Sequence, residues 1–202
     1  MRLVYRSVAA AIAAAFAVGL GAPAALAAFE FGTVPKLPIL STVTLNAKAQ
    51  TVNTTMTNFA VLDTRGTKSG WNVTVAGQSG TGKSAVFAQY CPKAKCGSQA
   101  EGYIGGGKAM VAKSLSLNST GAKFTGGTGT APTLQCSTAC SVDSATAVKI
   151  ASAATGGAGE STWTTTGFST TSLALSVPTT LKVLPSEEIY RVNLLWTLAT
   201  GP

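Results

Sequence analysis

Strict alternation of apolar and polar side chains is clearest near the end of the chain. Tyr190, Val192, Leu194, Trp196 and Leu198 occupy every second position. In an extended chain all five side chains would point to one face. The pattern predicts one continuous strand over 190–198 with a buried face. The residues predicted on its polar face are Arg191, Asn193 and Thr197.

Shorter runs with the same period of two occur earlier, at 42–45, 71–75 and 173–177, and 56–63 is a further strand candidate rich in threonine and apolar residues. Glycine-rich turns, which include 105–107, 126–127 and 156–157, lie between the strands. Short alternating strands with turns between them are typical of antiparallel sheets that pack face to face or close on themselves. The sequence therefore predicts an all-β protein, with a single antiparallel β-sandwich or barrel-like domain. Its richness in threonine, serine and glycine agrees with strands and turns rather than helices.

The first 27 residues have a different pattern. Arg2 and Arg6 precede an apolar stretch over 8–20, and Ala-Leu-Ala at 25–27 has the small-x-small form of a signal peptidase site. A membrane anchor is the alternative, but the apolar stretch is shorter than the roughly 20 residues that a spanning helix needs. We predict a signal peptide over 1–27, and no membrane-spanning segment in the mature chain.

The mature chain is predicted to begin with an N-terminal arm. Two prolines and little periodicity over 29–38 indicate an extended arm over 28–40, followed by a β-domain over 41–202. The middle of that domain, about 83–140, is rich in lysine and cysteine and is predicted to be an insertion between strand-rich ends.

Positive charge is concentrated in this central segment. The chain has 15 basic and 7 acidic residues, a formal charge of +8, and removal of the two leader arginines leaves +6. Glu101 is the sole acidic residue over 83–123. A solvated surface is the ordinary interpretation of such lysines, and a diffuse site for an anionic polymer is the functional one. The candidate binding lysines are Lys83, Lys93, Lys95, Lys108, Lys113 and Lys123.

The four cysteines form two local pairs. Cys91 and Cys96 enclose four residues, and Cys136 and Cys140 enclose three. In an exported protein such pairs more often form disulfides than bind metal, although a four-thiolate zinc site is the alternative. We predict the bridges Cys91–Cys96 and Cys136–Cys140 among the three possible connectivities, and no metal.

The inventory of side chains excludes several classes of enzyme. The chain contains no histidine, which rules out Ser-His-Asp and Cys-His mechanisms. Residues 77–84 match the P-loop pattern, but only six residues separate them from Cys91-Pro92, too few for the helix that a P-loop requires. Export also removes the nucleotide. We therefore predict a turn here, and a non-enzymatic protein without cofactor, nucleotide or nucleic acid.

Two blocks of the sequence have distinctive motifs. The first is Asp-x-Arg-Gly at 63–66 followed by Gly-Trp at 70–71, and the second is Tyr-x-x-x-Leu-x-Trp-x-Leu at 190–198 with a closing proline. Together they resemble the bacterial WxL cell-surface domain. The first block departs from the family pattern because Val73 stands where leucine is usual. The motif positions are Asp63, Arg65, Gly66, Gly70, Trp71, Val73, Tyr190, Leu194, Trp196, Leu198 and Pro202.

This resemblance implies a surface protein that is secreted and attached to the Gram-positive cell wall without a covalent link. Domains similar to this one bind peptidoglycan and often act beside other surface proteins. A cationic surface would meet the phosphate and carboxylate groups of the wall. We expect peptidoglycan or an attached anionic polymer as the partner. The alternative is a structural or adaptor component that binds another exported protein.

The motif residues have structural and functional interpretations. Trp71 and Trp196 alternate with aliphatic neighbours, which predicts core positions rather than sugar contacts. Trp163 lies among threonines and is the better candidate for an exposed, sugar-stacking ring. Asp63 and Arg65 are two residues apart and are predicted to pair and lock the turn before Trp71, with ligand recognition as the alternative.

Overall fold

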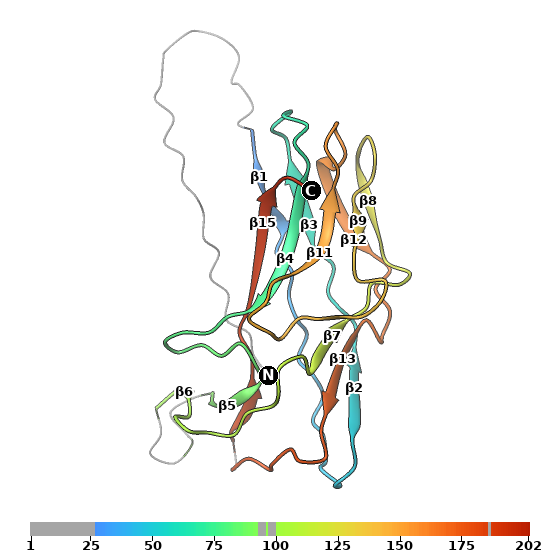
Figure 1. Ribbon diagram of the computed structural model, residues 1–202. Helices are drawn as coiled ribbons and strands as arrows, with labels where there is room; N and C mark the ends of the chain where they lie inside the picture. Colours follow the sequence, from blue (N-terminus) through green and yellow to red (C-terminus); the bar gives the residue numbers. More distant parts are fainter. Residues whose placement is uncertain (1–26, 93–95, 97–99, 186) are drawn as a thin grey trace.

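The computed structural model describes residues 27–92, 96, 100–185 and 187–202; most of the predicted signal peptide and the candidates Lys93 and Lys95 lie outside these residues. The described chain forms strands and no helix (Figure 1). The strands are β1 (Phe29–Thr33), β2 (Gln50–Thr54), β3 (Ala60–Asp63), β4 (Trp71–Gly77), β5 (Ala88–Cys91), β6 (Gly102–Tyr103), β7 (Leu115–Leu117), β8 (Lys123–Thr128), β9 (Thr133–Leu134), β10 (Cys140–Ser141), β11 (Val148–Ala153), β12 (Glu160–Thr166), β13 (Leu173–Val177), β14 (Ile189–Arg191) and β15 (Leu194–Thr200). The predicted all-β class is confirmed.

The strands form four antiparallel sheets. Their orders are β1-β3-β12-β8, β15-β4-β11-β9, β10-β7-β13-β2 and β14-β5-β6. Figure 1 shows the first two sheets together at one end of the molecule and the shorter strands at the other. None of these sheets closes on itself within the described residues. The arrangement is therefore sandwich-like, and the barrel alternative is not adopted.

One continuous hydrophobic core joins these sheets. On β4 the side chains of Trp71, Val73 and Val75 are buried and alternate with half-buried polar neighbours, as the period-two pattern predicts. Phe124 of β8 lies edge-on to Trp71, with ring centroids 5.8 Å apart, and makes a similar contact with Phe59. These contacts place the interior between the β4 sheet and the β12 sheet.

The predicted continuous strand over 190–198 is divided in the structure. Residues 189–191 form β14 and pair with β5, whereas 194–200 form β15 and pair with β4. Asn193 stands at the change of sheet, where its N–H donates to the Ser84 carbonyl and its own carbonyl accepts from Gln78 N, both at 2.8 Å. Arg191 is turned inward and is 5% exposed, contrary to the polar face expected for it.

The predicted arm and the first predicted strand also differ from expectation. Residues 29–33 form β1, which pairs with β3 and so belongs to the first sheet. Over 42–45 the expected alternation is present, because Val43 and Leu45 are half-buried and Thr42 and Thr44 are exposed. This stretch nevertheless joins no sheet among the described residues. It belongs to the connection that runs along the molecule from β1 to β2 (Figure 1).

Candidate functional site

The two motif blocks lie side by side. β15 pairs with β4 along its whole length, and Trp196 stands opposite Val75 and Leu198 opposite Val73. Directly opposite residues of an antiparallel pair share one face, so these side chains all point toward the core. The blocks therefore form a scaffold in the interior rather than a surface patch.

Arg65 connects β15 of this scaffold to the strands β3 and β1. Its Nη2 lies 2.7 Å from Oδ2 of Asp63 and its Nε donates to Oδ1 at 2.9 Å, a bidentate ion pair. Nη1 donates to the Thr200 hydroxyl at 2.7 Å, and the guanidinium lies 3.5 Å over the Phe29 ring. The hydrogen bonds from Arg65 lower the pKa of Asp63, although partial burial opposes this effect. The arrangement suits a structural clamp.

Two tryptophans are buried by different means. Trp71 is fully buried, and its Nε1 donates to the Gly159 carbonyl at 3.0 Å. Trp163 is 5% exposed and donates to the Glu160 carbonyl at 2.8 Å, so the expectation of an exposed ring at this position is wrong. A Cβ on Gly127 would lie 2.0 Å from the Trp163 ring. The missing side chain on β8 thus creates the space for the indole, a signal that threonine neighbours alone did not give.

Trp196 is half-buried and packs 6.4 Å from Phe59, measured between ring centroids. Its Nε1 is buried and has no hydrogen-bond acceptor among the described residues. The Trp196 ring therefore packs at the edge of the hydrophobic core.

The residues that match the P-loop pattern form a turn, as predicted. Lys83 N donates to the Gly80 carbonyl at 3.0 Å, and these two residues form an isolated β-bridge. The Ser84 hydroxyl, which would hold magnesium in a nucleotide site, donates instead to the Val86 carbonyl at 2.8 Å. The next element is the strand β5.

Both predicted disulfides are formed. Cys91 is joined to Cys96, and Cys136 to Cys140, with Cα–Cα distances of 5.9 Å and 5.4 Å. The first bridge begins at the end of β5 and the second ends at the start of β10. Each therefore fixes a connection beside a strand.

The lysines and aspartates are distributed differently between surface and interior. All nine lysines that the structure describes are exposed, and the one ion pair among the described residues is Asp63–Arg65. Asp143 is fully buried, and its two carboxylate oxygens accept N–H bonds from Ser114 and Leu115, each at 2.9 Å. Burial raises the pKa of Asp143, while these N–H bonds oppose the change. Both aspartates thus point inward.

The candidate lysines that the structure describes come from three parts of the fold. Lys83 lies in the turn between β4 and β5, Lys108 and Lys113 lie between β6 and β7, and Lys123 begins β8. Lys108 Nζ donates to the Val183 carbonyl at 2.7 Å. The four therefore come from one turn, one connection and one strand start rather than from a single element.

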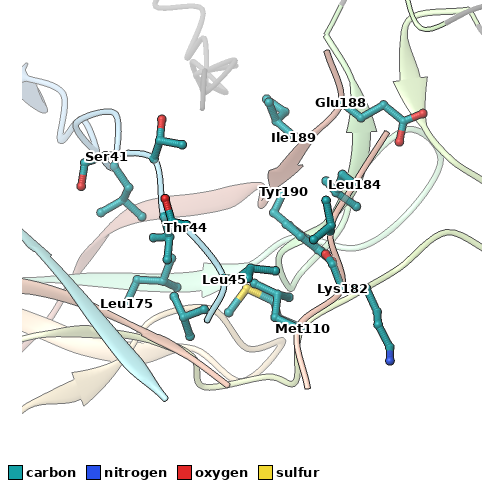
Figure 2. A pocket seen from close by; sticks show the side chains of 16 residues that line it. Ser41, Thr44, Leu45, Met110, Leu175, Lys182, Leu184, Glu188, Ile189 and Tyr190 are labelled. Atoms are coloured by element: carbon teal, nitrogen blue, oxygen red, sulfur yellow. The ribbon is translucent and has the colours of Figure 1, made fainter. Parts of the chain in front are cut away.

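A large cavity, which we call the apolar groove, was not predicted from the sequence. It has a volume of about 580 Å³ and lies between residues 40–45 and 181–184, with β13 and 188–190 completing it. Figure 2 shows Leu45, Met110 and Leu175 gathered between the walls, with Lys182 and Glu188 directed away from them. Of the motif positions only Tyr190 contributes, and its hydroxyl donates to the Lys182 carbonyl at 2.8 Å. Alternation over 42–45 was a useful signal for one wall of the groove, but alternation does not reveal that this stretch lacks a neighbouring strand in the described part of the chain.

Comparison with known families agrees with the arrangement of the motif blocks. A family model described as "WxL domain surface cell wall-binding" matches residues 24–202. The chain belongs to the WxL family. WxL domains are cell-wall-binding domains rather than an enzyme family, so this WxL protein is attached to the cell wall at the extracellular surface. No curated protein and no solved structure matches the chain. In the described part of this WxL protein, no helix has the length and apolar character needed to cross a membrane.

Proposed function

We propose that this WxL domain attaches to the wall by binding the anionic groups of peptidoglycan, or of the polymers linked to it, through its exposed lysines. The observation that supports this proposal is the partition of charge. The described lysines are exposed and form no ion pairs with described residues, whereas both aspartates are buried and bonded. The outer surface is consequently more cationic than the net charge of the chain suggests.

Lysines from several parts of the fold suit a polymeric ligand. A single exposed charge contact contributes about 1 kcal/mol or less, so useful affinity requires many contacts along one chain. A wall polymer supplies repeated phosphate or carboxylate groups, and linked contacts reinforce one another. In this proposal the β4–β15 scaffold sets the positions of the loops, and the loops carry the lysines.

The test is co-sedimentation of the purified protein with isolated Gram-positive walls, prepared with and without their phosphate polymers. Binding is expected to weaken steadily between about 50 mM and 1 M salt, because screening shortens the reach of exposed charges. The loss of binding on removal of the phosphate polymers would assign the ligand to them, and its retention would assign the ligand to peptidoglycan.

Two matched variants test the lysines directly. In one, Lys83, Lys93, Lys95, Lys108, Lys113 and Lys123 are all replaced by glutamine, and in the other the same six are replaced by arginine. The glutamine variant is expected to lose most of its binding, and the arginine variant to keep it, because arginine preserves the charge. Equal binding by the two variants, or no sedimentation of the wild type with either wall, would contradict the proposal.

A further inference from the structure

One wall of the apolar groove is a strand-like segment whose backbone is unpaired. Over 37–45, in the described residues, one backbone group forms a hydrogen bond: the Thr44 carbonyl accepts from Gln50 Nε2 at 3.0 Å. The side chains still alternate, with Val43 and Leu45 turned to the protein and Thr42 exposed. The segment has the side-chain pattern of a strand in a sheet and lacks the neighbouring strand.

The facing wall is also poor in backbone hydrogen bonds. Leu181 N donates to the Pro178 carbonyl, but the N–H groups of residues 182–184 have no acceptor among the described residues. Unpaired backbone groups beside an apolar surface favour the addition of another extended chain, which supplies the missing hydrogen bonds and places alternate side chains in the groove.

Exposed apolar side chains lie in the groove or next in sequence to residues that line it. Val183 lines it and is 72% exposed, Ile39 precedes its first residue and is 65% exposed, and Val111 follows the lining residue Met110. These are three of the four large apolar side chains that are exposed in the described part of the chain. An exposed apolar side chain such as Val183 in the wall of an apolar groove favours an interaction surface.

The chemistry of the groove indicates a peptide as its occupant. Its interior is lined by leucine, valine and methionine, which suit large apolar side chains, and a glycan strand has neither such side chains nor a peptide backbone. Lys182 lies in the wall, and Lys108 is bonded to it through the Val183 carbonyl. Neither lysine is ion-paired within the described residues, and the carboxylate of Glu188 accepts a hydrogen bond from Gln89 Nε2.

We propose that the apolar groove binds an extended segment of a second exported protein by strand addition. The segment has apolar residues at alternate positions and acidic residues between them, which would meet Lys108 and Lys182. The inference goes beyond wall binding, and Lys108 is the one residue that it shares with the six candidate wall-binding lysines.

The test begins with a displayed library of random 12-residue peptides selected on the purified protein. Enrichment of peptides that alternate apolar and acidic residues is the expected result. Failure to enrich any peptide, or enrichment of basic or non-alternating peptides, would overturn the proposal. Self-association of the protein through the groove, detected by gel filtration, would assign the site to a second copy and would also overturn it.

Proline substitutions then test the backbone contacts. Successive N–H groups of an extended chain point to opposite edges, so Ser41→Pro and Thr42→Pro remove a donor from each edge in turn. One of the two is expected to weaken the enriched peptide by about tenfold, the change in affinity that 1.4 kcal/mol represents. Ser41→Ala and Thr42→Ala keep the N–H and are the matched controls. Unchanged affinity in both proline variants would contradict strand addition.

A charge pair at an exposed position tests the preference for acidic peptides. Val183→Glu and Val183→Lys lose the same apolar contact, and neither disturbs the core because the side chain is 72% exposed. The glutamate variant is expected to bind the peptide at least about tenfold more weakly than the lysine variant. Wall sedimentation of the same variants is expected to be unchanged, so failure of the groove proposal is distinguishable from failure of wall binding. Equal peptide affinity in both variants would contradict the acidic occupant.

Discussion

Arg65 brings together residues that are far apart in the sequence. It pairs with Asp63, donates to Thr200 and lies over Phe29, so β3, β15 and β1 all depend on one guanidinium. Five donors in a planar fork make arginine suited to this role, and lysine could form only part of the arrangement. The main effect of changing this pair should therefore be on stability.

Replacing Asp63 by asparagine tests this pair through its pH dependence. Because hydrogen bonds from Arg65 hold the pKa of Asp63 below its ordinary value of 3.8, the carboxylate stabilises the fold above that pH. This contribution is lost as the pH falls through the lower pKa of the folded state. Asp63→Asn should cost about 2 kcal/mol near neutral pH and much less near pH 2. Urea unfolding at both pH values measures the difference.

A control for this experiment is Glu30→Gln, which changes an exposed carboxylate on β1. Its effect on the free energy of unfolding should be small at both pH values. A cost of Asp63→Asn that is the same at neutral and acid pH would contradict the assigned role of the carboxylate.

The motif glycines Gly66 and Gly70 permit a direct comparison of backbone strain with steric overlap of an added Cβ. Both have positive φ, at 66° and 68°, but a Cβ on Gly66 would meet open space and one on Gly70 would lie 2.3 Å from the Ala153 carbonyl oxygen. Gly66→Ala should cost about 1 kcal/mol, from backbone conformation alone. Gly70→Ala should cost at least about 3 kcal/mol or prevent folding. Equal costs in thermal unfolding would contradict this distinction.

Trp163→Phe separates a core role from a sugar-binding role. The change removes the bond from Nε1 to the Glu160 carbonyl while it keeps an aromatic ring beside Gly127. The free energy of unfolding should fall by about 1–2 kcal/mol. Wall binding by the folded variant should be unchanged, since the ring is buried. A loss of wall binding with unchanged stability would restore the stacking hypothesis.

At the scale of elements, alternation within strands could be predicted and pairing between them could not. The faces of β4, β13 and β15 follow directly from their sequences, because one buried side imposes a period of two. The stretch 42–45 has the same period and no partner, since alternation reports burial of a face and says nothing of hydrogen bonds at an edge. The change of sheet at Asn193 depends on backbone groups of Ser84 and Gln78, which no local pattern reveals.

In the candidate site, too, the sequence predicted local features and did not predict contacts between distant segments. The motif resemblance located β4, β15 and the Asp63–Arg65 pair, all of which are scaffold. The apolar groove is formed from segments about 140 residues apart in the sequence, and Trp163 was misplaced because its pocket is created by a glycine on another strand. Features that depend on tertiary neighbours were therefore the ones that sequence reasoning missed.

The disulfide bridges give a prediction at the level of short connections. Each closes a loop with a sequence separation of only 5 or 4 residues. The chain-entropy model assigns about 2 kcal/mol to loops of this length. Replacing both cysteines of either pair by serine should lower the free energy of unfolding by about that amount and leave a folded protein. Denaturant unfolding measures it, with the other pair intact as the internal comparison. Complete loss of folding in either variant would show a larger structural role.

For the molecule as a whole, the continuous core predicts a single cooperative transition. Buried residues from the three four-stranded sheets belong to one cluster, and Trp71 and Trp163 lie in it on different sheets. Unfolding followed by tryptophan fluorescence and by far-UV circular dichroism should therefore give coincident curves. Two separate transitions would show that the insertion or one sheet unfolds independently.

The pairing of β4 with β15 also affects when the protein can fold. Asn72 Nδ2 donates to the Gly201 carbonyl at 2.7 Å, across a separation of 129 residues. Ordering so long an intervening chain is slow, and topologies dominated by such distant pairings fold on the scale of milliseconds to seconds. The β4 sheet lacks its β15 edge until the last strand has been synthesised. We therefore expect the nascent chain to lack a stable β4 sheet until synthesis of β15 is complete.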